Sequence, residues 1–151
     1  MIFGKKGEYA IRALVHLAQA RQRCRARDIS RDQMVPYDFI AKVLQELKAK
    51  GFVRSVRGVG GGFVLARPAA DIGLMEVMAA MDCNHLLEKC VYGLAECSDS
   101  NPCPLHRDWK PIRSQIEVYL LSHTIADLAA VGTEMIRTET RFSPSALRDK
   151  N

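Results

Sequence analysis

The 151-residue chain lacks any run of about 18 uncharged apolar residues, so the sequence predicts no membrane-spanning helix. Glu8 and Arg12 interrupt its N-terminal apolar stretch and no small-residue cleavage site follows, which argues against a secretory signal peptide. We therefore expect a cytoplasmic protein. Internal repeats are also absent. The chain is too short for most multidomain enzymes, and with 48% hydrophobic and 26% charged residues it has the composition of a globular protein, not of a disordered one.

Basic residues are concentrated in the first half of the chain. Residues 1–70 carry 14 Lys and Arg against 5 Asp and Glu, a net +9, whereas residues 71–151 carry 8 against 12, a net −4. The basic half fits contact with a polyphosphate backbone, because each Lys or Arg that neutralises a phosphate releases a condensed counterion. A solvated basic face would have the same composition, so charge alone leaves both interpretations open.

The first 70 residues predict a winged helix-turn-helix. Apolar periodicity predicts a helix over about residues 6–20, then two helical turns with Ile29 and Met34 inward, and a third helix that Pro36 opens and Gly51 ends. The inward stripe of the third helix consists of Phe39, Ile40, Val43, Leu44 and Leu47. A short strand at residues 52–56, a glycine-rich turn and a returning strand at residues 63–66 complete a β-hairpin.

The sequence RGVGGG forms the tip of this hairpin. A nucleotide-binding loop needs a helix directly after its glycines, and here a strand follows. As the tip of a wing, the segment places Arg57 to enter a minor groove, while Gly58, Gly60 and Gly61 let the backbone approach phosphates closely. A plain flexible turn is the alternative.

The exposed N-terminal end of the third helix carries Tyr37, Asp38, Ala41 and Lys42. These residues would meet base edges if the helix lies in a major groove. Asp38 either accepts a hydrogen bond from a cytosine amino group or, more commonly for aspartate, caps the helix. Lys42 can reach guanine or phosphate.

Beyond the hairpin, a short helix is expected over about residues 74–81, followed by an aperiodic polar stretch over residues 82–102. A long helix then carries apolar residues at alternating spacings of four and three, which is typical of a helix that packs lengthwise on another helix. This seam consists of Leu105, Trp109, Ile112, Ile116 and Tyr119, and Pro111 kinks the helix or marks its start. Thr124 with Asp127 resembles a capping box that opens a last helix.

We therefore predict a mainly α fold with a small β-hairpin. Residues 1–82 form a winged helix-turn-helix head that binds DNA, residues 83–103 a cysteine loop, residues 104–137 a dimerisation helix and a final helix, and residues 138–151 a disordered tail.

Five cysteines in a chain without an export signal are not expected to form a disulfide framework, because the cytoplasm keeps thiols reduced. Cys24 stands alone among arginines, and the other four, Cys83 included, lie within 21 residues. Cys90, Cys97, Cys103 and His106 offer three thiolates and an imidazole at spacings that one loop can fold around an iron–sulfur cluster. Zinc would accept the same set but usually takes close CxxC-like pairs. Unligated thiols or reversible disulfides remain a further alternative.

The chain resembles the Rrf2-type transcriptional regulators. The resemblance covers about residues 1–135 and rests on FIAKVLQELKAKGFVRSVRGVGGGFVLARP, with GEYAIRALVHLA, IGLMEVMAAMD and TIADLA in support. It implies a homodimeric, sequence-specific repressor that is not an enzyme and that reads an imperfect palindrome in double-stranded DNA.

The cysteine loop resembles the branch of the family that includes the iron–sulfur biogenesis regulator, the nitric-oxide-responsive repressor and the iron-responsive repressor. That resemblance implies a [2Fe-2S] or [4Fe-4S] cluster on Cys90, Cys97 and Cys103, sensing iron, redox state or nitric oxide. The first gap has six residues where two of those regulators have five. His106 matches the fourth ligand of one member and is favoured here, whereas Glu8 stands where other members take a ligand from the partner subunit. Cys83 has no counterpart.

Two alternatives have different chemistry. A metal-free regulator of the same family would use the clustered cysteines as a thiol redox relay. A small iron–sulfur electron-transfer protein would need neither the +9 head nor the wing, which argues against it.

Overall fold

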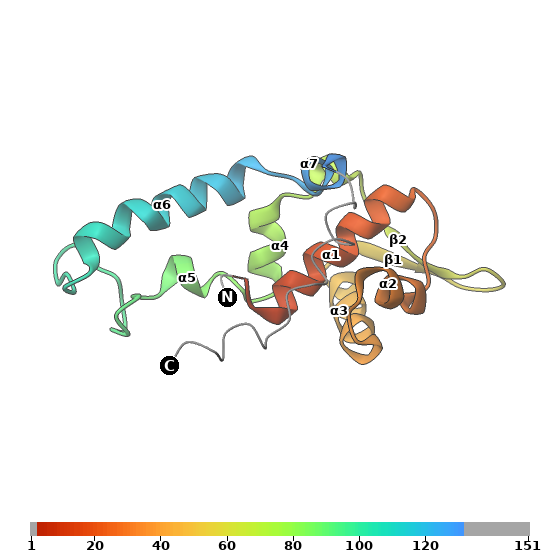
Figure 1. The fold of residues 1–151 in the computed structure, drawn as a ribbon, viewed down its shortest axis with the longest axis horizontal. Coiled ribbons are helices and arrows are strands. Elements are labelled where there is room, and N and C mark those ends of the chain that lie inside the picture. The colour runs from red at the N-terminus through yellow and green to blue at the C-terminus, as the bar shows by residue number, and fades with distance from the viewer. Residues whose placement is uncertain (1–2, 132–151) are drawn as a thin grey trace, which may run out of the picture.

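The structure, a computed structural model, describes residues 3–131 (Figure 1). Its elements are, in chain order, α1 (Gly4–Ala20), α2 (Ala26–Gln33), α3 (Tyr37–Ala49), β1 (Val53–Val56), β2 (Gly62–Leu65), the 3-10 helix η1 (Ala69–Asp71), α4 (Leu74–Ala80), α5 (His85–Glu88), α6 (His106–Ser122) and α7 (Ile125–Ala130). The hairpin projects from a helical head at one end of the molecule, and α6 extends from the head as an arm toward the other end (Figure 1). The predicted fold class, mainly α with a small hairpin, is confirmed.

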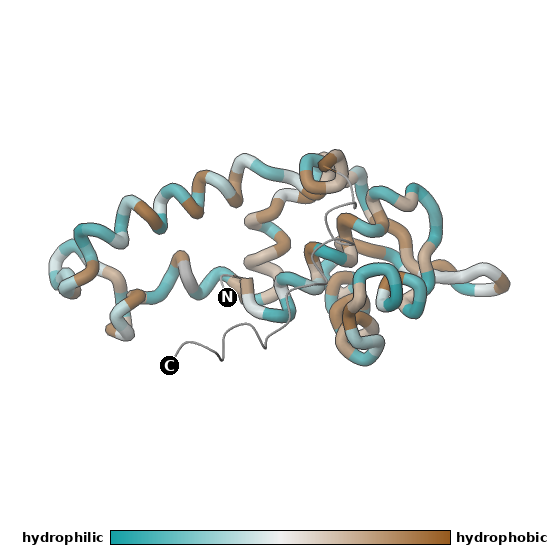
Figure 2. The backbone as a smooth tube through the Cα atoms, viewed as in Figure 1, coloured by the Kyte–Doolittle hydropathy of each residue, from teal (hydrophilic) through white to brown (hydrophobic). Residues whose placement is uncertain are grey.

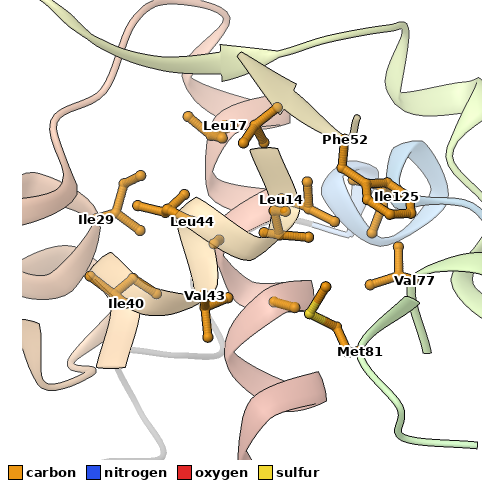
Figure 3. Close-up of a cluster of buried hydrophobic side chains, with 14 of the residues drawn as sticks. Leu14, Leu17, Ile29, Ile40, Val43, Leu44, Phe52, Val77, Met81 and Ile125 are labelled. Atoms are coloured by element: carbon orange, nitrogen blue, oxygen red, sulfur yellow. The ribbon is translucent and has the colours of Figure 1, made fainter. Parts of the chain in front are cut away.

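Aliphatic side chains from α1, α2 and α3 meet in one buried cluster, as Figure 3 shows. Leu14, Ile29, Ile40 and Leu44 in this cluster are fully buried. α2 ends where Met34 adopts a left-handed conformation with φ of 51°, and α3 starts three residues later. This short connection lets the two helices pack against each other, so the predicted helix-turn-helix is present.

Two apolar side chains that the periodicity placed in the core lie outside it. Met34 is 50% exposed, whereas Gln33 is only 2% exposed, because the helix ends at Gln33 and the left-handed residue turns its side chain outward. Phe39 is also exposed and lies edge-on to Tyr9, with ring centroids 6.1 Å apart. At about 100° per residue, it lies roughly 90° around the helix from the centre of the buried stripe. The predicted inward orientation of Met34 and Phe39 was wrong.

The hairpin is antiparallel, and its register joins Val53 to Leu65 and Val56 to Gly62. Phe52 enters it from the end of α3 and is buried in the head. The hairpin therefore stands on the core while its turn extends into solvent (Figure 1).

The last described helix, α7, returns to the head and packs against α1. Ile125 is fully buried in the same cluster as Leu14 and Phe52 (Figure 3). Thr124 and Asp127 form the predicted capping box. The head is thus completed by residues that follow the arm in sequence. The tail predicted over residues 138–151 lies outside the described residues.

The arm, α6, contains Pro111 in its first half and continues past it to Ser122, so the helix begins before the proline. Near the head, Leu120 packs against Leu74 and Met78 of α4. Apolar and polar residues alternate along the whole arm (Figure 2). No helix of the described part is long and apolar enough to cross a membrane.

Candidate nucleic-acid interface and cysteine loop

The start of α3 presents the predicted base-reading side chains to solvent. Tyr37, Asp38 and Lys42 are exposed, and Ala41 is half-buried. Arg27 of α2 lies over the Tyr37 ring, 5.6 Å from its centroid, which adds a cation to this surface. The helix end therefore combines a hydroxyl, a carboxylate, an ammonium and a guanidinium, which are groups that can pair with base edges and phosphates.

Helix α3 begins without a side-chain cap. Pro36 occupies the N-cap position, and no side chain within residues 3–131 accepts a hydrogen bond from the first turn. Asp38 thus does not cap the helix, contrary to the commoner of its two expected roles. Its carboxylate lies in the first turn, where the helix dipole favours negative charge, and it remains free to meet a partner.

The turn between β1 and β2 exposes the predicted wing residues. Arg57 is exposed, and so is its neighbour Val59, which the sequence did not single out. Gly58 and Gly60 have φ of 95° and 72°, conformations that favour glycine. A Cβ on Gly61 would lie 2.6 Å from the last carbonyl oxygen of β1, so the turn closes tightly only with glycine there.

A basic segment that sequence reasoning left unassigned lies beside the wing. Cys24, between α1 and α2, exchanges two backbone hydrogen bonds with Phe63 of β2, with N···O distances of 3.0 and 2.8 Å. Its side chain is buried, and burial raises the pKa of its thiol. Arg23 and Arg25 on either side are exposed. The sequence could have indicated this basic surface, because an arginine stands at every second position from 21 to 27 and side chains alternate along an extended segment.

The loop before α6 brings the predicted ligands together in two pairs. The side chains of Cys90 and Cys103 lie close enough to interact with each other. Cys97 Sγ lies 3.4 Å from His106 Nδ1. All but Cys97, which is half-buried, are buried. Across residues 3–131, no three His, Cys, Asp or Glu side chains converge as a site for one metal ion.

The surroundings move the pKa values of the Cys90–Cys103 pair in opposite directions. Burial works to raise the pKa of Cys90, but the backbone N–H groups of residues 92–94 and the side chain of Cys103 outweigh it and lower that pKa. Burial and the hydrogen bond with Cys90 raise the pKa of Cys103. Anionic sulfur in this pair is therefore favoured at Cys90, within a group of N–H donors.

His106 has a second partner that the sequence analysis missed. Its Nε2 lies 2.7 Å from Asp99 Oδ1, and Lys110 Nζ donates to both Asp99 oxygens at 2.8 and 2.7 Å. Lys110 first, and then His106, hold the pKa of Asp99 below its usual range. His106 and Lys110 are four positions apart, which places both on one helix face. This spacing is the feature of the sequence that could have indicated a shared partner.

Glu8 and Cys83 have their contacts elsewhere. Glu8 pairs with two basic residues of its own helix, at 3.5 and 3.2 Å. Cys83 Sγ, after α4, donates to a backbone carbonyl at 3.2 Å and lies against Gly7 of α1. Of the two candidates for a fourth ligand, His106 contacts a cysteine of the loop, whereas Glu8 contacts residues of α1.

Comparison with known proteins shows the family. The Rrf2 family, described as iron-dependent transcriptional regulators, matches residues 3–131. An HTH-type transcriptional regulator of Aquifex aeolicus is 35% identical over 131 residues, covering 85% of this chain and 91% of the relative. The HTH-type transcriptional regulator IscR of Vibrio atlanticus is 34% identical over 125 residues, covering 82% of this chain and 72% of the relative.

Solved structures of similar fold agree. The structure of CymR, the global cysteine regulator of B. subtilis, has a TM-score of 0.70 at 21% identity and covers 86% of this chain and 97% of its own. IscR of T. potens has a TM-score of 0.67 at 25% identity and covers 87% of this chain and 88% of its own. With its winged head, its cysteine loop and these relatives, the chain belongs to the Rrf2 family of DNA-binding transcriptional regulators, which are not enzymes.

Proposed function

We propose that the chain is a homodimeric, sequence-specific repressor whose affinity for DNA is set by an iron–sulfur cluster bound to Cys90, Cys97, Cys103 and His106. The observation that carries the proposal is that one loop of a DNA-binding regulator pairs Cys90 with Cys103 and Cys97 with His106. The family's description as iron-dependent supports it.

The donor set fits a cluster better than a single ion. A two-iron cluster with four protein ligands takes two on each iron, and the loop offers Cys90 with Cys103 and Cys97 with His106 as two pairs. Tetrahedral zinc needs four donors around one point, an arrangement that the described residues do not form. The N–H groups around Cys90 also suit a cluster, whose sulfurs accept such hydrogen bonds. When bound, the cluster would supply a centre that reacts with oxidants or nitric oxide.

The DNA-binding surface would combine the start of α3, the wing and the basic link. Tyr37, Asp38, Ala41 and Lys42 would meet the major groove, and the wing turn at 57–61 the adjacent minor groove or its phosphates. The exposed arginines of the link would add phosphate contacts beside the wing. This surface would hold part of the excess of basic residues in the first 70 residues.

The arm would form the dimer. The inner half of the predicted seam, Trp109 and Ile116, is half-buried toward the rest of the chain, but Leu105, Ile112 and Tyr119 are exposed at intervals of seven residues. An apolar stripe with this interval suits pairing with a two-fold mate. The two heads would then read half-sites about one or two helical turns apart.

Size-exclusion chromatography with light scattering tests this stripe. Ile112→Asp should dissociate the dimer, because it places a charge in the apolar contact. Val118→Asp is the matched control, since Val118 is also exposed, at 62% against 48% for Ile112, on another face of the same helix. Dissociation by both variants or by neither contradicts the assignment of the interface to this stripe.

The position of the loop constrains how a cluster would act on DNA. The loop lies at the end of the arm away from the wing (Figure 1), so it would affect DNA binding through α6 and its contacts with α4 and α5. A change in how the arms pair would alter the spacing of the heads. Allosteric couplings of this kind typically amount to about 1 to 3 kcal/mol.

The decisive experiment is anaerobic purification with iron and sulfide counts and absorbance spectra, followed by salt-dependent DNA binding before and after exposure to oxygen or nitric oxide. Changing Cys90, Cys97 or Cys103 to alanine should abolish stable cluster binding, whereas Cys83→Ala should retain it. An indispensable Cys83, or a dispensable member of the other three, contradicts the ligand assignment. Colourless, iron-free protein that binds DNA equally well contradicts the proposed function.

A metal-free thiol regulator is the second candidate, and the contact between Cys90 and Cys103 favours it. The lowered pKa of Cys90 beside a second thiol suits disulfide formation, in which the two thiols lose two protons and two electrons to an oxidant such as a peroxide. Iron-free wild-type protein whose DNA affinity changes on peroxide treatment, but not after Cys90→Ser, would establish this alternative.

A further inference from the structure

The side chain of His106 is held between two partners in the cysteine loop. Its ring is buried, with Nδ1 3.4 Å from Cys97 Sγ and Nε2 2.7 Å from Asp99 Oδ1. The two contacts are on opposite edges of the imidazole. One nitrogen therefore faces the thiols, and the other faces a carboxylate at the surface.

The partners of Asp99 determine which nitrogen carries the proton. Lys110 Nζ, which can only donate, contacts both oxygens of Asp99, so the carboxylate is ionised and accepts hydrogen bonds. His106 Nε2 must then donate its N–H to Asp99. In a neutral ring this leaves the lone pair on Nδ1, the nitrogen that faces Cys97.

The bridge from Asp99 to Lys110 contributes little to folding. The side chain of Asp99 is 71% exposed and that of Lys110 is 52% exposed, and exposed ion pairs of this kind stabilise proteins only slightly. Lys110 is one helical turn beyond His106 on α6, so it anchors the carboxylate at a constant place relative to the ring. This arrangement orients the histidine more than it stabilises the chain.

We propose that Asp99, held by Lys110, is a positioning residue that directs Nδ1 of His106 toward the iron–sulfur cluster. The inference rests on the proposed function. Histidines that bind metals commonly donate their other N–H to a carboxylate, which orients the ring and makes it a stronger electron donor. The role assigns His106 coordination through Nδ1, not Nε2, and gives Asp99 an influence on the cluster without contact to it.

The test compares Asp99→Asn with Asp108→Asn after identical anaerobic reconstitution. Asparagine keeps the shape of aspartate and removes its charge. Asp108 is an exposed aspartate of α6, the helix that carries His106. We expect Asp99→Asn to lose its cluster to a chelator about tenfold faster than the wild type. We also expect its reduction potential to rise, because a neutral amide makes the imidazole a weaker donor. Asp108→Asn should match the wild type in both.

Selective ¹⁵N labelling of the imidazole identifies the ligating nitrogen. In the reduced wild-type cluster, pulsed electron paramagnetic resonance should find the strong coupling at Nδ1, and strong coupling at Nε2 overturns the inference. So does an unchanged potential in Asp99→Asn, even if cluster loss is faster, because a purely structural role of Asp99 would change only the rate.

The metal-free protein provides a readout that does not need the cluster. Nitrogen NMR of the neutral His106 ring should find the proton on Nε2 in the wild type and a mixture of tautomers in Asp99→Ala. A proton on Nδ1 in the wild type overturns the inference. Wild-type protein that takes up no cluster overturns the proposed function instead, so the two failures are distinguishable.

Discussion

Removing the wing-tip cation by Arg57→Ala should weaken DNA binding and leave folding nearly unchanged. Arg57 is exposed, and no hydrogen bond or ion pair holds it within the described part of the chain, so the free energy of unfolding should change by less than about 0.5 kcal/mol. Loss of its DNA contact should cost about 1 to 3 kcal/mol of binding free energy. That range corresponds to an increase of about 5- to 150-fold in Kd.

The assay is fluorescence anisotropy at several salt concentrations, on a duplex selected from a random library with the wild-type chain. Each lost phosphate contact lowers the slope of log K against log salt by about 0.9, so two wings of a dimer should lower it by about 1.8. A smaller change in slope with an equal loss of affinity would identify Arg57 as a base-edge contact. The measurement thus also distinguishes the two contacts available to the wing.

Arg107→Ala is the matched control. Arg107 is an exposed arginine at the start of α6, the end of the arm that lies opposite the wing (Figure 1). Its removal lowers the net charge equally, so it should change Kd by less than about twofold if affinity depends on contact and not on total charge. Unaltered affinity of Arg57→Ala, or equal losses in both variants, would refute the role of the wing.

Three further predictions concern the head. Ile125→Ala should lower the free energy of unfolding by about 2 to 5 kcal/mol in urea titrations, because Ile125 is fully buried, whereas the exposed Val131→Ala should change it by less than about 0.5 kcal/mol. Gly62→Ala should speed hydrogen exchange at the two amides that join the basic link to β2, because its Cβ would lie 2.5 Å from a link carbonyl oxygen. Gly73→Ala should not, because its backbone suits alanine and an added Cβ would meet no atom within 4 Å. Burial lowers the pKa of His16 from 6.5, so the unfolded chain binds a proton at higher pH than the folded one, and stability should fall as pH decreases below 6.5. Thermal melts across that window should show a weaker pH dependence in His16→Gln, and an unchanged dependence would contradict the assignment.

Local sequence patterns predicted most of the individual elements. Periodicity located the helices of the head, the glycine-rich turn located the wing, and Thr124 with Asp127 located the start of α7. These features depend on residues close together in the chain, which is why the sequence alone is sufficient. Where periodicity failed, at Met34 and Phe39, the reason was also local, since a helix end and a one-residue offset decide which side chain points inward.

The tertiary structure decided which distant residues meet. Cys24 pairs with Phe63, Ile125 completes a core that begins at α1, and Asp99 binds the imidazole of His106. None of these contacts follows from spacing, because each depends on the path of the chain between the partners. The sequence by itself determined the elements, the charge of the head and the identity of the thiol and imidazole donors. Only the fold determined that the donors associate as two pairs at the end of the arm, because that geometry depends on where α6 leads away from the head.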